Sequence, residues 1–212
     1  RPMNRSRSSN AWLREHVNDT YVQRAKAQGY RSRASYKLVE MDERDHLIRA
    51  GDVVVDLGAT PGGWSQVAAK KMQGKGRIIA VDLLEMDPLP GVIFVQGDFR
   101  EQAVLHNLEN LLAGEKVGLV LSDMSPNISG IALCDQARAA HLAELALEFA
   151  RNWLKPDGAL LVKAFHGSGF NDFVLEMRKT FKAVSSRKPD ASRDRSPEVY
   201  LLGRTLKTCS DR

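Results

Sequence analysis

The sequence predicts an α/β fold with a mostly parallel, seven-stranded sheet, helices on both faces and an antiparallel last strand. From about residue 50 onward, short apolar runs alternate with helical patterns, which is typical of parallel strands joined by crossover helices. The polar segment 188–197 joins the last two runs and has no helical pattern, so the final strand is expected to reverse direction. The expected strands are 52–56, 77–82, 92–96, 117–122, 159–164, 181–187 and 198–203, and the expected helices of this part are 64–72, 101–112, 135–153 and 169–180.

Two further helices are expected before the first strand. Residues 9–27 place apolar side chains at mixed three- and four-residue spacing, which indicates an amphipathic helix, and Gly29 interrupts it. A second helix is expected from residue 32 or 33 to about residue 45. Helix 135–153 has the clearest pattern in the chain, a wide apolar face followed closely by Pro156.

Length and composition predict one globular domain within the 212 residues. The expected parts are a disordered basic tail at 1–9, a single domain at 10–205 that includes a helical N-terminal extension at 10–50, and a short tail at 206–212. No apolar run approaches the roughly 20 residues of a membrane span, and no apolar core follows the basic N-terminus as in a secretory signal. Cys134 and Cys209 lie far apart and lack metal-ligand spacing, which predicts a reduced cytoplasmic compartment and no metal site. A monomer without a membrane partner is also expected.

The most informative motif joins the apolar run 53–55 to the helix at 64–72 and reads Asp56-Leu57-Gly58-Ala59-Thr60-Pro61-Gly62-Gly63-Trp64. Glycines allow the backbone to approach a ligand closely, and the helix N-terminus presents free N–H groups. The glycines do not have the G-x-G-x-x-G spacing that a pyrophosphate requires. A nucleoside cofactor without phosphates, such as S-adenosylmethionine, fits this loop better, with the Trp64 ring as a flat apolar group beside the pocket.

Three more acidic residues follow expected strands, and the carboxyl ends of parallel strands meet at one edge of a sheet. Asp82 stands where such folds place the carboxylate that binds both ribose hydroxyls. Asp98 could accept a hydrogen bond from an adenine amino group, or could cap the helix that begins near Glu101. Asp123 points at the same crevice in this arrangement, although a purely structural turn remains an alternative.

Lys163 ends the fifth expected strand and should lie close to Asp123. A lysine at the end of an apolar run often extends to solvent, but desolvation and a second ammonium favour the neutral form that a general base requires. Lys37 and Glu198 are the candidate neighbours, and taken singly each would be assigned to the solvated surface.

The charge is distributed unevenly along the chain. The formal net charge is +5, yet residues 1–37 carry +7, residues 178–212 carry +6, and the region between them is acidic. Two basic ends around an acidic body suggest a surface for a polyanion, although solvated tails are an alternative. The basic residues expected to bind RNA phosphates are Arg31, Arg33, Lys188, Arg193 and Arg195, and the aromatic residues among them that could stack on bases are Trp12, Tyr21, Tyr30 and Tyr36.

In order along the chain, these motifs resemble the FtsJ/RrmJ family of RNA 2′-O-ribose methyltransferases. The resemblance covers about residues 9–202 and rests on Lys37, the loop from Asp56 to Gln66, Asp82, Gly97-Asp98-Phe99, Ser122-Asp123-Met124-Ser125-Pro126-Asn127, Lys163 and Ser196-Pro197-Glu198-Val199-Tyr200. It implies a Rossmann-like methyltransferase fold with S-adenosylmethionine as cofactor. The segment from Arg31 to Leu38 is most similar to the bacterial ribosomal branch, which implies methylation of a uridine ribose in large-subunit ribosomal RNA, on the assembled or nearly assembled subunit.

Carried over by position, the resemblance implies two sets of site residues. Cofactor contacts would come from Gly62, Trp64, Asp82, Asp98 and Asp123, and the catalytic tetrad would be Lys37, Asp123, Lys163 and Glu198. Thr60 stands where the family commonly has alanine, which affects the expected detail of the loop. The alternatives are a methyltransferase for tRNA or mRNA caps, a non-catalytic RNA-binding assembly factor, and a nicotinamide-dependent oxidoreductase, which the loop spacing disfavours.

Overall fold

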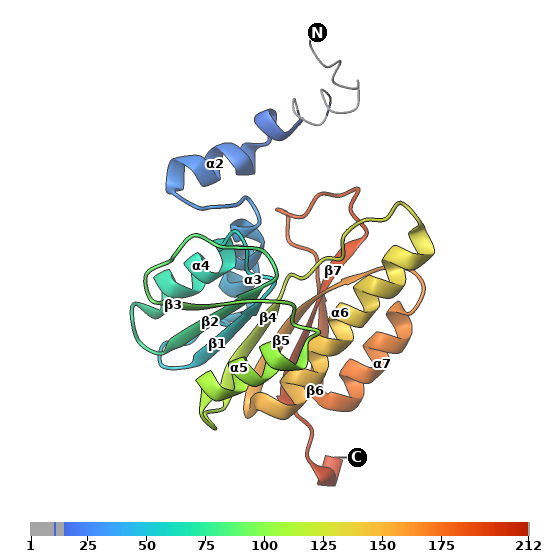
Figure 1. Ribbon diagram of the computed structural model, residues 1–212. Helices are drawn as coiled ribbons and strands as arrows, with labels where there is room; N and C mark the ends of the chain where they lie inside the picture. The colour runs from blue at the N-terminus through green and yellow to red at the C-terminus, as the bar shows by residue number, and fades with distance from the viewer. Residues whose placement is uncertain (1–10, 12–14, 212) are drawn as a thin grey trace.

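The computed structural model describes residue 11 and residues 15–211, so the basic tail expected at 1–9 lies outside the described residues. Seven strands within the described part form one sheet in the order β3-β2-β1-β4-β5-β7-β6 (Figure 1). Their bounds are β1 Val53–Leu57, β2 Arg77–Asp82, β3 Val92–Gln96, β4 Val117–Ser122, β5 Leu154–Phe165, β6 Phe181–Arg187 and β7 Glu198–Leu206.

The strand directions confirm the predicted fold. β1 pairs in parallel with β2 and β4, β3 is parallel to β2, and β5 is parallel to β4, whereas β7 is antiparallel to both β5 and β6. Because β7 is reversed, its first residue, Glu198, pairs with Phe165, the last residue of β5. The start of β7 therefore lies at the edge where β1–β5 end, which is where open α/β sheets bind ligands.

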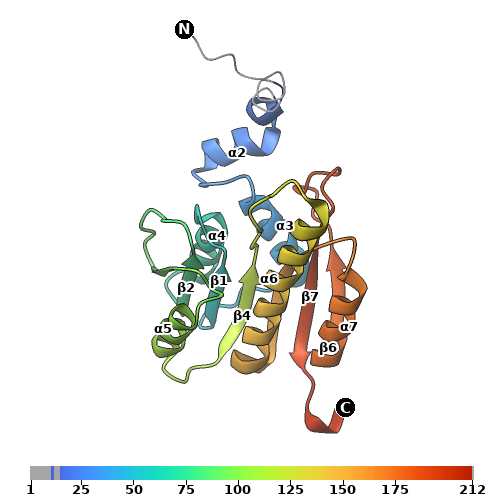
Figure 2. The ribbon, with the colours of Figure 1, turned by 45° about the vertical axis from the view of Figure 1, so that its right-hand side comes forward.

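Helices cover both faces of the sheet (Figure 1, Figure 2). They are α2 Thr20–Gln28, α3 Ser35–Asp45, α4 Gly63–Met72, α5 Gln102–Leu112, α6 Ala132–Trp153 and α7 Phe170–Thr180, followed by a short 3₁₀ turn at Cys209–Asp211. The core on one face packs residues of α5, α6 and α7 against the sheet, and the core on the other face packs α3 and α4. No helix in the described part of the chain is long and apolar enough to cross a membrane.

Several boundaries differ from the sequence prediction; β7, for example, ends at Leu206 and not at residue 203. The helix expected over 9–27 is interrupted at Asp19, whose Oδ1 accepts hydrogen bonds from the backbone N–H of Tyr21 and Val22 and so begins a new helix. Helix α6 begins at Ala132, three residues early. Strand β5 begins at Leu154, which pairs with Val117 before the register shifts, although the apolar run begins only later.

Helix α2 and the connection between β6 and β7 lie beyond the carboxyl edge of the sheet, whereas α3 packs on one face of the sheet (Figure 1, Figure 2). Contacts fix this placement: Arg33 Nη2 donates to the carbonyl oxygen of Ala191 at 2.9 Å, and the backbone N–H of Ala191 donates to the Glu40 carboxylate at 3.2 Å. Segments from opposite ends of the sequence thus lie side by side near the carboxyl edge of the sheet.

Gly203 in β7 generates a prediction about stability. A Cβ at this position would overlap the ring of buried Phe181. We expect Gly203→Ala to lower the free energy of unfolding in a urea titration by about 1–3 kcal/mol through overpacking. Phe181→Leu in the same chain should recover part of this loss, and an unchanged unfolding midpoint for Gly203→Ala would show that the close approach is absent.

Candidate active site at the carboxyl edge of the sheet

The glycine loop lies between the end of β1 and the start of α4. Gly58 has φ +76°, and a Cβ there would lie 2.8 Å from Cγ of Met124, so glycine lets this loop contact the loop after β4. Gly62, with φ +111°, is the N-cap of α4. The first N–H groups of a helix have no intrahelical acceptor, so residues 63–65 offer donors suited to a carboxylate.

Asp82 is held by the two loops beside it. Its Oδ2 accepts a hydrogen bond from the backbone N–H of Thr60 at 2.9 Å, and its Oδ1 accepts one from the N–H of Leu84 at 2.8 Å. The Thr60 hydroxyl donates to the Leu84 carbonyl at 3.1 Å. The threonine that departs from the family pattern therefore ties the glycine loop to the connection after β2 and leaves Asp82 at the strand end where it was expected.

Asp98 faces Arg100, in a two-point ion pair with closest distance 2.6 Å between Oδ2 and Nη2. The hydrogen bonds from Arg100 hold the pKa of Asp98 below its ordinary value. The alternative role as a helix cap is wrong, because the N-cap of α5 is Glu101 and the backbone N–H that donates to the Asp98 carboxylate is that of Arg100, outside the helix.

The Trp64 ring does not form an open wall as expected. The residue is 3% exposed, its Nε1 donates to the Ala34 carbonyl at 2.8 Å, and its ring centroid lies 5.6 Å from that of Tyr200. The indole belongs to the core under α3 and α4, so the backbone N–H is the part of Trp64 that remains for a cofactor.

Asp56, the first residue of the motif, is fully buried. Its Oδ2 accepts a hydrogen bond from the Ser65 hydroxyl at 2.7 Å, and its Oδ1 has no hydrogen-bond partner among the described residues. Burial raises the pKa of Asp56 to about 7; the Ser65 hydrogen bond opposes that rise, and the charges of Asp123 and Asp82 add to it. The unpartnered oxygen and the neighbouring carboxylates make this part of the sheet edge acidic, which suits a cationic ligand.

The four residues of the expected tetrad lie together. Lys163 Nζ is 3.1 Å from Asp123 Oδ1 and 3.9 Å from Glu198 Oε2, and Lys37 Nζ is 2.5 Å from Glu198 Oε1. The Lys163 side chain is 8% exposed, so it does not extend to solvent. Residues from α3, β5, β7 and the loop after β4 thus converge on one buried cluster of two ammonium groups and two carboxylates, which we call the tetrad.

Three residues that sequence reasoning did not assign support the tetrad. Ser125 Oγ accepts a hydrogen bond from Lys163 Nζ at 2.7 Å, the Tyr200 hydroxyl donates to Asp123 Oδ1 at 2.7 Å, and the Ser192 hydroxyl donates to Glu198 Oε1 at 2.8 Å. Tyr200 is the cross-strand partner of Lys163. The adjacent motifs contained Ser125 and Tyr200, whereas no local signal marked Ser192.

Two pKa directions follow from this environment. Burial raises the pKa of Glu198, but the charge of Lys37 and the hydrogen bonds from Lys37 and Ser192 outweigh burial, so the pKa lies below its ordinary value. Burial, with the Asp123 charge beside it, raises the pKa of Tyr200 well above its ordinary value. Glu198 is therefore an ionised carboxylate and Tyr200 a neutral hydroxyl that orients Asp123.

The basic residues expected to bind RNA are engaged within the protein. Arg33 Nε contacts Asp19 at 2.8 Å, Arg193 contacts the same carboxylate at 3.6 Å, and Arg195 contacts Glu15 at 2.6 Å. Lys188 Nζ donates to the backbone carbonyls of Ser196 and Glu198, and Arg31 donates to loop carbonyls. Arg195 keeps the most exposed side chain of the three paired arginines, at 65%.

Not all of the aromatic residues that were expected to stack on RNA bases have a free ring face. Tyr36 is 2% exposed, and the rings of Tyr21 and Tyr30 lie 5.7 Å and 5.5 Å from it, so Tyr36 has no face free for a base. Trp12 lies outside the described residues.

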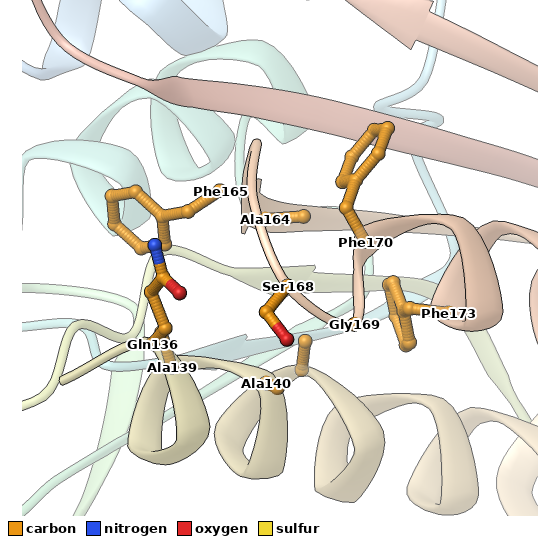
Figure 3. A pocket seen from close by; sticks show the side chains of 10 residues that line it. Gln136, Ala139, Ala140, Ala164, Phe165, Ser168, Gly169, Phe170 and Phe173 are labelled. Atoms are coloured by element: carbon orange, nitrogen blue, oxygen red, sulfur yellow. The ribbon is translucent and has the colours of Figure 1, made fainter. Parts of the chain in front are cut away.

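A shallow apolar pocket adjoins the tetrad and was not anticipated from the sequence (Figure 3). It holds about 340 Å³ of space, part of it open to solvent, between the first half of α6 and the connection from β5 to α7. Its lining comprises Gln136, Ala139, Ala140, Ala143, Ala164, Phe165, Ser168, Gly169, Phe170 and Phe173. The Phe165 ring centroid is 5.9 Å from Lys163 Nζ, so this residue borders both the pocket and the tetrad.

In the described part of the chain, no group of three His, Cys, Asp or Glu side chains is arranged to hold a metal ion, and both cysteines are free and exposed.

Comparisons with known proteins find a matching family model and similar relatives. A family model described as FtsJ-like methyltransferase matches residues 30–206. The chain is 63% identical over 205 residues to a Dechloromonas aromatica protein named ribosomal RNA large subunit methyltransferase E. The match covers 97% of this chain and 100% of that protein. A protein of the same name from Methylobacillus flagellatus is 61% identical over 201 residues, covering 95% and 97%. A solved Plasmodium falciparum structure described as a ribosomal RNA methyltransferase has a TM-score of 0.74 at 29% identity, covering 84% of this chain and 98% of that one.

The buried Asp56 generates a prediction about pH. Its raised pKa means that the folded state keeps a proton that the unfolded state releases above about pH 4, so Asp56 lowers the free energy of unfolding as the pH rises from about 4 to about 7. Asp56→Asn removes this loss. We expect the variant to gain about 2–4 kcal/mol relative to the unaltered protein between pH 4 and pH 8 in urea titrations. Parallel pH curves for the two proteins would show that Asp56 ionises normally.

Proposed function

The chain belongs to the FtsJ-like methyltransferase family, and on that premise we propose that it methylates the 2′-oxygen of a uridine ribose in large-subunit ribosomal RNA with S-adenosylmethionine as the methyl donor. Near-complete coverage of relatives named for large-subunit ribosomal RNA supports the choice of substrate. A ribosomal subunit as the partner places the proposed reaction in the cytoplasm, on the assembled or nearly assembled particle.

The residues at the carboxyl edge fit S-adenosylmethionine. A ligand with a sulfonium, an amine and a ribose is complementary to the carboxylates at the ends of the first four strands and to the unpartnered Oδ1 of buried Asp56. Its own carboxylate suits the open N–H groups of residues 63–65, and the loop geometry does not require a phosphate. A dinucleotide, in contrast, would bring two phosphates to an edge rich in negative charge.

Each of the expected residues would contact a different part of this ligand. Asp82, fixed by the N–H groups of Thr60 and Leu84, would accept hydrogen bonds from the ribose hydroxyls. Asp98 would accept one from the adenine amino group, and the backbone at Gly62 and Trp64 would hold the amino-acid end. Asp123 would offset the sulfonium charge while it contacts Lys163.

The tetrad supplies what the chain must add to the reaction. When bound, S-adenosylmethionine supplies an activated methyl group with a neutral thioether as leaving group. Lys163 would orient the ribose hydroxyl and, as the neutral amine, accept its proton to become an ammonium; Asp123 and Ser125 hold the side chain in place. Lys37 and Glu198 would position Lys163 and the ribose. The convergence of these four side chains on one point is the observation that carries the proposal.

Replacement of Lys163 tests the catalytic role. We expect Lys163→Met to lower the transfer of labelled methyl from S-adenosylmethionine to large ribosomal subunits, isolated from cells lacking the protein, by about 10²–10⁴-fold, because the group that orients and deprotonates the hydroxyl is lost. Lys179→Met, which removes an exposed lysine on α7, is the matched control and should keep full activity.

A second substitution separates two roles of the same side chain. Lys163→Arg keeps the positive charge but cannot release a proton at ordinary pH. Near-normal activity of this variant across the pH range would exclude proton acceptance and leave Lys163 as a group that only steers the hydroxyl. Methyl transfer to tRNA in place of subunits would contradict the proposed substrate.

The basic connection between β6 and β7 predicts a salt-dependent interaction with RNA. Binding to large-subunit RNA should weaken steeply as salt rises, because phosphate contacts release counterions. We expect Arg195→Ala to reduce the slope of log affinity against log salt by about 1. Arg49→Ala, which alters an exposed pair with Asp157 before β1, is the control and should leave the slope unchanged. A slope that is already near zero would argue against an RNA-binding surface.

A further inference from the structure

The guanidinium of Arg31 lies between two loops of the proposed cofactor site. Nη1 donates to the carbonyl oxygen of Pro61 at 3.2 Å and to that of Asp87 at 2.7 Å, and Nη2 donates to that of Pro88 at 2.8 Å. Pro61 belongs to the glycine loop, whereas Asp87 and Pro88 belong to the connection from β2 to β3. One side chain therefore bonds to both loops of the proposed cofactor site.

The same two loops are joined a second time through Asp82. Its carboxylate accepts from the N–H of Thr60, next to Pro61, and from the N–H of Leu84 in the following connection. Arg31 thus bridges backbone carbonyls, and Asp82 bridges backbone N–H groups, of one pair of loops. A change in the spacing of the loops would alter both bridges together, and Asp82 is the residue proposed to hold the ribose.

The surroundings of Arg31 are built to keep it in this position. The Arg31 backbone N–H donates to Gln66 Oε1 at 2.8 Å, and Gln66 Nε2 donates to the Gly29 carbonyl at 3.2 Å, so helix α4 fixes the segment that carries the arginine. A Cβ at Gly62 would lie 3.0 Å from Arg31 Nη1 and 3.1 Å from Met86 Sδ. Glycine at position 62 therefore leaves the room that the guanidinium occupies.

We propose that Arg31 is a positioning residue of the cofactor site, which sets the spacing of the glycine loop and the connection after β2 by bridging their carbonyls. This inference rests on the proposed function and replaces the expected role of Arg31 as a phosphate contact. Three of the five N–H donors of the side chain are already used by these carbonyls. A lysine cannot reproduce the bridge, because its ammonium is a point donor and not a planar fork.

The experiment is a calorimetric titration of S-adenosylmethionine into the full chain without RNA, for the unaltered protein, Arg31→Ala and Arg31→Lys. Arg49→Ala, which alters the exposed pair with Asp157, is the matched arginine control. Hydrogen bonds from a charged donor contribute enough free energy that we expect both Arg31 variants to bind S-adenosylmethionine at least about tenfold more weakly, whereas Arg49→Ala binds it normally. Methyl transfer at saturating S-adenosylmethionine should recover in Arg31→Lys, so the KM for the cofactor rises more than kcat falls.

Thermal unfolding without ligand separates this role from a loss of folding. If Arg31→Ala does not fold, Arg31→Lys decides the question, because it keeps the charge and most of the volume. Cofactor binding by either folded variant within twofold of the unaltered protein would overturn the inference. An unaltered protein that binds no S-adenosylmethionine would instead contradict the proposed function itself, so the two failures are distinguishable.

Discussion

The arrangement of the carboxyl edge of the sheet depends on the carboxylate of Glu198. A buried carboxylate is costly unless it is paired and fully hydrogen-bonded, and Glu198 meets this condition through Lys37, Ser192 and, more distantly, Lys163. Its partners come from α3, from the connection between β6 and β7, and from β5. Each of these segments must be in place before the charge is balanced, so the requirement to neutralise one carboxylate couples the N-terminal helices to the far end of the chain.

The parallel part of the sheet explains the acidic half of the site. Parallel strands bring their carboxyl ends to one edge, and β1 to β4 each lead into an aspartate there: Asp56, Asp82, Asp98 and Asp123. Carboxylates gathered at one edge repel one another, and the protein compensates for this repulsion in different ways. Asp82 accepts backbone N–H groups, Asp98 pairs with Arg100, and Asp56 takes up a proton near neutral pH. Such an edge favours a ligand that brings positive charge of its own.

The strands and the order of the helices could be predicted because they depend on local pattern and on topology. The full tetrad followed only from the resemblance to a known family, since Lys37 and Glu198 taken singly would be assigned to the solvated surface. Apolar runs mark the strands, and a reversed last strand places Glu198 beside the residues that end β5. The direction of a side chain depends on long-range contacts that no local pattern contains. The Trp64 ring lies in the core and donates to the Ala34 carbonyl. Arg31 donates to the carbonyls of Pro61 and Asp87, which are 30 and 56 residues away in sequence. The break at Asp19 shows the same limit, since one capping carboxylate outweighs an apolar pattern that continues through it.

Asp123 follows the central strand β4, with the proposed cofactor half of the sheet on one side and the tetrad half on the other. It is the one residue expected to serve both halves. A substitution of Asp123 would therefore affect both halves at once. The packing of Trp64 of α4 on Tyr200 of β7 couples the same two halves a second time, through the core.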